Sequence, residues 1–153
     1  MSVTSGGTAP KGCSAGGSSS GSVGSAGIVM TLSAVHVYDT QPDPSSPQLL
    51  KTIDAKELAA NAGYSRPHTL HCGPDGIFLS CLGGADGNDG PGGIALLDHT
   101  TFDVLRAWET DRGPQYLAYD AWWHLNQNVA ITSEWGTPSM VEGGIVPELL
   151  LGQ

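Results

Sequence analysis

The chain has 153 residues, a formal net charge of −9, and only 6 lysine and arginine residues in total. Binding to nucleic acid or to an anionic membrane surface requires clustered cations, so this composition argues against both kinds of partner. The length allows one domain at most, and no apolar run approaches the roughly 18 residues of a membrane span. Frequent glycine (22) and proline (10) favour short strands joined by turns over a helical bundle.

The first 32 residues are predicted to be a disordered leader rich in Gly, Ser and Ala. Between Ser2 and Gly27 this segment carries a single charge, Lys11, and almost nothing that could be buried. Such a segment does not offset its own ordering entropy. The apolar piece Ile28–Met30 is too short for a signal peptide, and the basic region that would precede it is nearly absent.

The three cysteines are Cys13, Cys72 and Cys81, an odd number without a Cys-x-x-Cys pair. This spacing is not a disulfide framework, so a reducing compartment is the default. With no signal peptide visible, we expect a cytoplasmic protein.

Residues 33–153 are predicted to form an all-β domain. The patterns typical of strands are short apolar or alternating runs bounded by turn residues. They cover residues 35–38, 49–53, 77–82, 94–97, 104–108 and 128–135. One or two helical turns are expected over residues 56–61, with Gly63 as the C-cap.

A format of apolar strand, Asp-led turn and apolar strand occurs twice. Asp39 and Asp98 hold corresponding places in the two copies. A unit of short strands that recurs after roughly 50 residues is typical of a propeller or a solenoid. Such units bury their faces only against neighbours, and about three or more are needed for stability. The chain holds about two, so we expect it to be a piece of a larger array.

The most informative stretch for chemistry is Ser65–Gly76, which contains His68, His71 and Cys72. On a helix, residues i and i+3 share a face, whereas on a flat strand they point to opposite faces. Pro67 predicts an extended residue before it, and the Gly-Pro-Asp-Gly sequence is typical of a turn, so a strand is favoured. The two histidines would then bind one ion only if the backbone bends. The alternative is two polar residues that make ordinary hydrogen bonds.

The glycine-rich stretch over residues 83–93 is predicted to be a flexible connection between strands. No Gly-Lys-Ser/Thr follows it, so it does not match a phosphate-binding loop. Asp86 and Asp89 lack the spacing and the closing Glu of an EF-hand.

The remaining candidate side chains are interpreted as structural. Glu134 is expected to make a hydrogen bond at a strand end rather than act as an acid, since it has no partner acid. Cys81 is predicted to be a small buried hydrophobe. The histidines without other donors close by are expected at the surface: His36, His99 and His124. The tryptophans are predicted to pack between sheets, and the alternative is an aromatic lining for a small thiol: Trp108, Trp122, Trp123 and Trp135.

From about Val35 to the last residue, the sequence resembles the selenium-binding protein/methanethiol oxidase family. The resemblance rests on the order and spacing of five stretches: residues 65–77 (Ser-Arg-Pro-His-Thr-Leu-His-Cys-Gly-Pro-Asp-Gly-Ile), 92–98 (Gly-Gly-Ile-Ala-Leu-Leu-Asp), 101–109 (Thr-Phe-Asp-Val, then Trp-Glu), 119–122 (Tyr-Asp-Ala-Trp) and 132–138 (Thr-Ser-Glu-Trp-Gly-Thr-Pro). The family also carries a His-His pair before this region and a Tyr-Gly-His segment after it, and neither is found here. The chain therefore resembles a piece of the family that lacks both ends.

The resemblance implies part of a seven-bladed β-propeller, about two blades, from a copper-dependent oxidase. Such enzymes convert methanethiol, a small thiol, to formaldehyde, hydrogen sulfide and hydrogen peroxide. The implied copper ligands in this chain are His68 and His71, one as ligand and the other as a group that orients it, because copper favours imidazole and sulfur. Cys72 is the candidate for selenium or thiol binding. The remaining ligands are expected outside this chain, and for bacterial relatives the family leaves a periplasmic location open.

Three hypotheses follow for the function. The first is a part of a copper-dependent methanethiol oxidase, with little activity expected from this piece alone. The second is a module that binds selenium or a protein partner without turnover. The third is an inactive truncated gene product, whose exposed sheet edges would favour aggregation.

Overall fold

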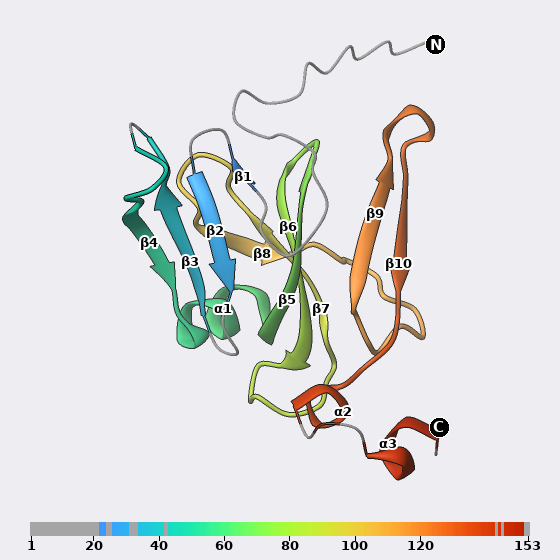
Figure 1. The fold of residues 1–153 in the computed structure, drawn as a ribbon. Coiled ribbons are helices and arrows are strands. Elements are labelled where there is room, and N and C mark those ends of the chain that lie inside the picture. Colours follow the sequence, from blue (N-terminus) through green and yellow to red (C-terminus); the bar gives the residue numbers. More distant parts are fainter. Residues whose placement is uncertain are drawn as a thin grey trace, which may run out of the picture.

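The computed structural model describes residues 22–23, 26–30, 34–41, 43–142, 144 and 146–151. These residues are mostly β, with antiparallel sheets and few helices, as the strand patterns predicted. Figure 1 shows the three sheets side by side. The four-stranded sheet that comes later in the chain lies in the middle, the earlier four-stranded sheet lies on one side of it, and a two-stranded hairpin lies on the other. Within the described part of the chain, no helix is long and apolar enough to cross a membrane.

The first sheet is a meander of β1 (Ser22–Val23), β2 (Ala26–Met30), β3 (Val35–Asp39) and β4 (Gln48–Ile53). Its first two strands lie inside the predicted disordered leader, so that prediction is wrong for these residues. Ile28, Val29 and Met30 are strand-forming residues, and β2 pairs in antiparallel register with β3 over its whole length. The pairing partner comes from outside the leader, which local composition does not reveal. The rest of the leader lies outside the described residues.

Helix α1 (Ala55–Ala62) connects the two four-stranded sheets. It begins at Asp54, whose carboxylate accepts hydrogen bonds from the backbone N–H groups of Lys56 and Glu57 at 2.9 and 2.8 Å. It ends at Gly63, which has a φ of 76°, a left-handed conformation that glycine adopts without steric cost. The predicted C-cap is therefore confirmed.

The second sheet contains β5 (Tyr64–Gly73), β6 (Gly76–Gly84), β7 (Gly93–Leu97) and β8 (Val104–Ala107), again as a meander. Every residue of β6 and β7 is buried. The sheet is covered on both faces, which explains why its central strands are almost continuously apolar instead of alternating.

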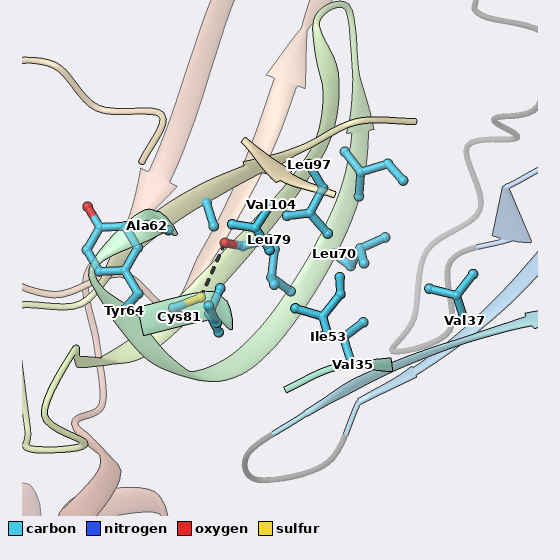
Figure 2. Close-up of a cluster of buried hydrophobic side chains, with 13 residues drawn as sticks. Val35, Val37, Ile53, Ala62, Tyr64, Leu70, Leu79, Cys81, Leu97 and Val104 are labelled. Carbon is cyan, nitrogen blue, oxygen red and sulfur yellow. Dashed lines mark hydrogen bonds between the residues drawn. The ribbon is translucent and has the colours of Figure 1, made fainter. Parts of the chain in front are cut away.

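One face of the second sheet packs against the first sheet and α1 (Figure 2). The buried side chains of this core come from seven elements: Val35, Val37, Ile53, Leu58, Ala62, Tyr64, Leu70, Ile77, Leu79, Cys81, Ala95, Leu97 and Val104. Cys81 is 0% exposed, and burial raises the pKa of its thiol. The prediction that Cys81 is a small buried hydrophobe is confirmed.

The opposite face of the second sheet packs against the hairpin of β9 (Asp120–His124) and β10 (Val129–Ser133), which a 3₁₀ turn (Leu125–Gln127) joins. Phe78 is the centre of this smaller core, with edge-to-face contacts to Trp108 and Trp123 at centroid distances of 5.4 and 4.8 Å. These two tryptophans pack between sheets as predicted. Trp122 and Trp135 do not, because their exposed fractions are 59% and 51%.

Two short helices, α2 (Pro138–Glu142) and α3 (Pro147–Leu151), follow the hairpin. Helix α2 is tied to the glycine-rich connection, since the backbone N–H and hydroxyl of Ser139 both donate to Asp89, at 2.8 and 2.6 Å. Within the same connection, Asp86 accepts a hydrogen bond from the backbone of Asn88. Both carboxylates are thus engaged by groups of the protein itself.

A cluster of polar side chains links the start of β5 to the segment that follows β8. The Tyr64 hydroxyl donates to Glu109 Oε2 at 3.1 Å, and Glu109 Oε1 accepts from the backbone N–H of Ile94 at 2.7 Å. Burial of the phenol, and after it the Glu109 carboxylate, raise the pKa of Tyr64 to about 12, against the opposing charge of Arg112.

Candidate functional site

A β-bulge in β5 decides where the two histidines point. The register of β5 against β6 shifts by one residue between Pro67 and Thr69, so His68 is the extra residue of the bulge. On a regular strand His68 and His71 would lie on opposite faces. With the bulge, both side chains contact the Tyr119–Asp120 segment at the start of β9. The backbone bend that joint use of the two histidines requires is therefore present.

Ser80, directly opposite the bulge on β6, holds it in place. Its side-chain oxygen accepts a hydrogen bond from the backbone N–H of Thr69 at 3.0 Å and donates one to the carbonyl of Tyr119 at 2.8 Å. Ser80 is only 3% exposed. The buried Ser80 hydroxyl thus provides the hydrogen-bond acceptor for the bulged strand and links that strand to the segment before β9.

The residue before Pro67 departs from the sequence-based expectation. Arg66 was predicted to be extended, but its φ is 57°, in the left-handed region that non-glycine residues seldom occupy. Its Nε lies 2.5 Å from Glu142 Oε1 of α2. This ion pair is a tertiary contact, which the local rule for residues before proline does not include.

His68 lies between its own strand and β9. Its Nδ1 is 2.7 Å from Thr69 Oγ1 and 3.0 Å from the Tyr119 carbonyl oxygen. The imidazole also stacks on the Tyr119 ring, with a centroid distance of 4.2 Å. One ring nitrogen and one ring face are therefore engaged by the protein.

His71 contacts the next residue of β9. Its Nε2 lies 2.9 Å from Asp120 Oδ1, and its side chain is 20% exposed. The imidazole of His71 also makes an edge-to-face contact with the Trp122 ring, with a centroid distance of 5.2 Å and an interplanar angle of 82°. Asp120 is itself fixed, because its Oδ1 accepts a hydrogen bond from the backbone N–H of Ala121 at 2.7 Å.

Cys72 follows His71 in sequence but lies on the other face of β5. It packs against the core between the two four-stranded sheets, as Leu70 does, whereas His71 faces the hairpin. Cys72 also takes part in a disulfide, which the number and spacing of the cysteines did not predict. The sequence made Cys72 the candidate for selenium or thiol binding, and in the structure Cys72 and His71 face opposite sides of β5.

The other candidates have structural environments. Glu134 Oε2 accepts hydrogen bonds from the backbone N–H groups of Tyr116 and Leu117 at 3.2 and 3.4 Å, which confirms its predicted role after a strand end. His36 contacts the Thr52 hydroxyl at 3.1 Å.

A hollow of about 430 Å³ lies between the end of β8 and β10, away from both site histidines. Its walls are Trp108, Glu109, Thr110, Asp111, Gln115, Ala130 and Thr132. In the described part of the chain, no group of three or more His, Cys, Asp or Glu side chains is placed to hold a metal ion. The bulge in β5 brings together two imidazoles, those of His68 and His71.

Sequence reasoning missed Ser80 and Asp120 as parts of this site. Ser80 interrupts the apolar run of residues 77–82, and a polar residue in such a run signals a buried hydrogen-bonding partner. Asp120 is a carboxylate placed among aromatic residues, which is a weaker signal. Neither pattern predicts that these residues lie beside the histidines of β5.

The described residues define a β protein of packed antiparallel sheets, with two hydrogen-bonded histidines where a bulged strand meets the next hairpin. The chain belongs to the selenium-binding protein family, since the family model described as 56kDa selenium binding protein matches residues 11–153. This match begins before residue 35, where the resemblance in the sequence became clear.

Individual relatives agree with this assignment. The chain is 39% identical over 116 residues to a protein named methanethiol oxidase from Danio rerio, which covers 75% of this chain and 25% of that protein. It is 36% identical to selenium-binding protein 2 from Mus musculus, over 75% of this chain and 24% of the relative. A solved structure of a hypothetical selenium-binding protein from Sulfolobus tokodaii superposes with a TM-score of 0.75 at 47% identity, over 80% of this chain and 27% of that one. The chain thus spans about a quarter of the length of the curated relatives it matches.

Proposed function

We propose that the chain forms about two blades of a seven-bladed β-propeller and contributes histidine ligands to the copper centre of a methanethiol oxidase. Two successive four-stranded antiparallel meanders, packed face to face and followed by a further hairpin, are what consecutive propeller blades look like. The proposed activity comes from relatives named methanethiol oxidase. The observation that carries the site is the bulge, which directs both His68 and His71 toward β9.

The two histidines are ligands of a type that copper binds, but they are too few to coordinate it by themselves. Imidazole nitrogen suits copper, and each histidine has one ring nitrogen to which the described residues make no hydrogen bond. Two imidazoles do not complete a coordination sphere, and among the described residues no third His, Cys, Asp or Glu is placed to hold a metal ion together with them. The remaining ligands would come from the parts of the family that this chain does not match.

In the proposed reaction, methanethiol, oxygen and water yield formaldehyde, hydrogen sulfide and hydrogen peroxide. Bound copper would supply the electron transfer between the thiol and oxygen. The residues of this chain would hold the imidazoles in a fixed orientation through the Tyr119 carbonyl and the Asp120 carboxylate. Ser80 would hold the bulge, and the Phe78 core would keep the hairpin against the sheet.

The test is copper(I) affinity, measured by competition with a chromophoric chelator. We expect the double variant His68→Ala/His71→Ala to bind copper at least tenfold more weakly than the wild-type chain, and the matched variant His36→Ala/His99→Ala to bind like wild type. The same substitutions at the aligned positions of the Danio rerio relative should abolish methanethiol oxidation there. Equal copper affinity in the two double variants would contradict the site assignment.

Selenium binding without turnover is the second candidate function, because one relative is named selenium-binding protein 2. Cys72 would be the binding group, and it would have to be released from its disulfide first. We expect selenite retention by the wild-type chain only after reduction, and none in Cys72→Ser. Retention that survives Cys72→Ser and Cys81→Ser would argue against both of these thiols as the binding group.

A further inference from the structure

Two consecutive residues, Tyr119 immediately before β9 and Asp120 at its start, each bind a different histidine of β5. Tyr119 uses its backbone carbonyl oxygen, 3.0 Å from His68 Nδ1, and Asp120 uses its carboxylate, 2.9 Å from His71 Nε2. Both acceptor groups lack a proton to donate. They therefore determine which ring nitrogen of each neutral histidine carries the proton, since a neutral imidazole has one N–H and one lone pair.

For His68, the proton belongs on Nδ1. A bare Nδ1 would direct its lone pair at the lone pairs of the Tyr119 carbonyl 3.0 Å away, which is repulsive. The hydroxyl of Thr69, 2.7 Å from the same nitrogen, is able to donate or accept, and it has the Tyr119 carbonyl as its own acceptor at 3.3 Å. All three groups are satisfied when Nδ1–H donates, and the lone pair is then on Nε2.

For His71, the opposite nitrogen carries the proton. An ionised carboxylate only accepts hydrogen bonds, so Nε2 donates to Asp120 Oδ1. The carboxylate is held in position by the backbone N–H of Ala121 at 2.7 Å. The lone pair of neutral His71 is then on Nδ1.

We propose that the dipeptide Tyr119–Asp120 is the positioning element of the site, fixing His68 with Nδ1–H and His71 with Nε2–H. The two nitrogens left open to a metal ion are then Nε2 of His68 and Nδ1 of His71, which the described residues leave without a hydrogen bond. This inference depends on the proposed function only in taking that ion to be copper. The histidines come from one sheet, and the acceptors that fix their protons come from the start of the next hairpin, so the site is assembled only when the hairpin docks.

The protonation pattern is measurable in the metal-free chain by long-range ¹H–¹⁵N correlation NMR, at a pH where the imidazoles are neutral. We expect His68 to show a protonated Nδ1, which is the less common form of a free imidazole, and His71 a protonated Nε2. A protonated Nε2 on His68, or a protonated Nδ1 on His71, would overturn the proposal.

The role of Asp120 is tested by Asp120→Ala, with Asp120→Glu as the variant that keeps a carboxylate and Asp75→Ala as a charge-matched control. In wild type and in the control, the His71 Nε2–H should exchange with water slowly enough to be observed. We expect Asp120→Ala to lose this signal while His68 keeps its own, and Asp120→Glu to restore it in part. An unchanged His71 signal in a folded Asp120→Ala chain would refute the positioning role.

Copper(I) titration separates this inference from the proposed function. Removing the group that orients a metal-binding histidine typically costs about 10- to 100-fold in metal affinity, and we expect this loss in Asp120→Ala but not in Asp75→Ala. If the NMR pattern is as expected but wild type does not bind copper, the proposed function fails and the positioning element stands. If copper binds through the histidines but the protons are on the other nitrogens, the inference fails alone.

Discussion

Replacing Ser80 with alanine tests whether the bulge depends on one hydroxyl. In the native chain this hydroxyl accepts the Thr69 N–H at 3.0 Å and donates to the Tyr119 carbonyl at 2.8 Å. The substitution removes both hydrogen bonds but almost no volume, so it isolates hydrogen bonding from packing. We expect the chain to fold with lower stability and with the histidines less firmly held.

The magnitude follows from which partners are left unpaired. The Tyr119 carbonyl keeps its contacts with His68 and Thr69, so its loss is small. The Thr69 N–H keeps no acceptor, and a buried donor left without a partner costs about 1–3 kcal/mol. Thr69 is half-buried rather than buried, which places the expected loss in the lower half of that range, at about 1–2 kcal/mol.

Urea unfolding followed by tryptophan fluorescence measures this loss. The matched control is Ser45→Ala, which removes a hydroxyl that donates to Asp43 at 2.7 Å in an exposed loop. A surface substitution of this kind is expected to change the free energy of unfolding by less than about 0.5 kcal/mol. Equal stabilities for the Ser80 and Ser45 variants would refute the reasoning, because the bulge would then not depend on the Ser80 hydroxyl.

Three further predictions concern the two cores and the polar cluster. Phe78→Ala should lower the free energy of unfolding by about 3–5 kcal/mol, because Phe78 is only 2% exposed. The control Ile131→Ala, at a 64% exposed position, should change this free energy by less than about 0.5 kcal/mol. Similar urea midpoints for the two variants would contradict this prediction. Glu109→Gln should lower the pKa of Tyr64 from about 12 in an ultraviolet titration. Because the folded-state pKa of this phenol is raised, its contribution to stability is complete below the unfolded-state value near 10 and is lost as pH rises toward 12; an unchanged Tyr64 titration in the variant would rule out the carboxylate as a cause. Cys81, 0% exposed, should resist iodoacetamide in the native chain and react after unfolding, and rapid labelling of the native thiol would show that this core opens.

Much of the local structure could be predicted from the sequence. The apolar runs of β6 and β7, the Gly63 cap of α1 and the strand containing the histidines each depend on signals within a few residues. Cys81 was recognised as buried because its neighbours in the strand are apolar. These features are local, so composition and spacing are enough to find them.

Two of the failures share a physical cause, which is a partner distant in sequence. Ala26–Met30 looked like part of a disordered leader because its pairing strand, β3, lies outside the leader. The backbone of Arg66 is left-handed and not extended, and its side chain forms an ion pair with Glu142, which lies far away in the sequence. Trp122 and Trp135 were expected to pack between sheets, but the described residues leave both half exposed.

For this protein, the sequence by itself determined the class of fold and the family, and it singled out two histidines as a candidate site. The tertiary structure decided how the side chains of those histidines are oriented. A spacing of three residues places side chains on opposite faces of a regular strand, and only the bulge at His68 brings both toward β9. The groups that bind them, Tyr119 and Asp120, lie about 50 residues further along the chain, and no local pattern in either segment specifies that they meet.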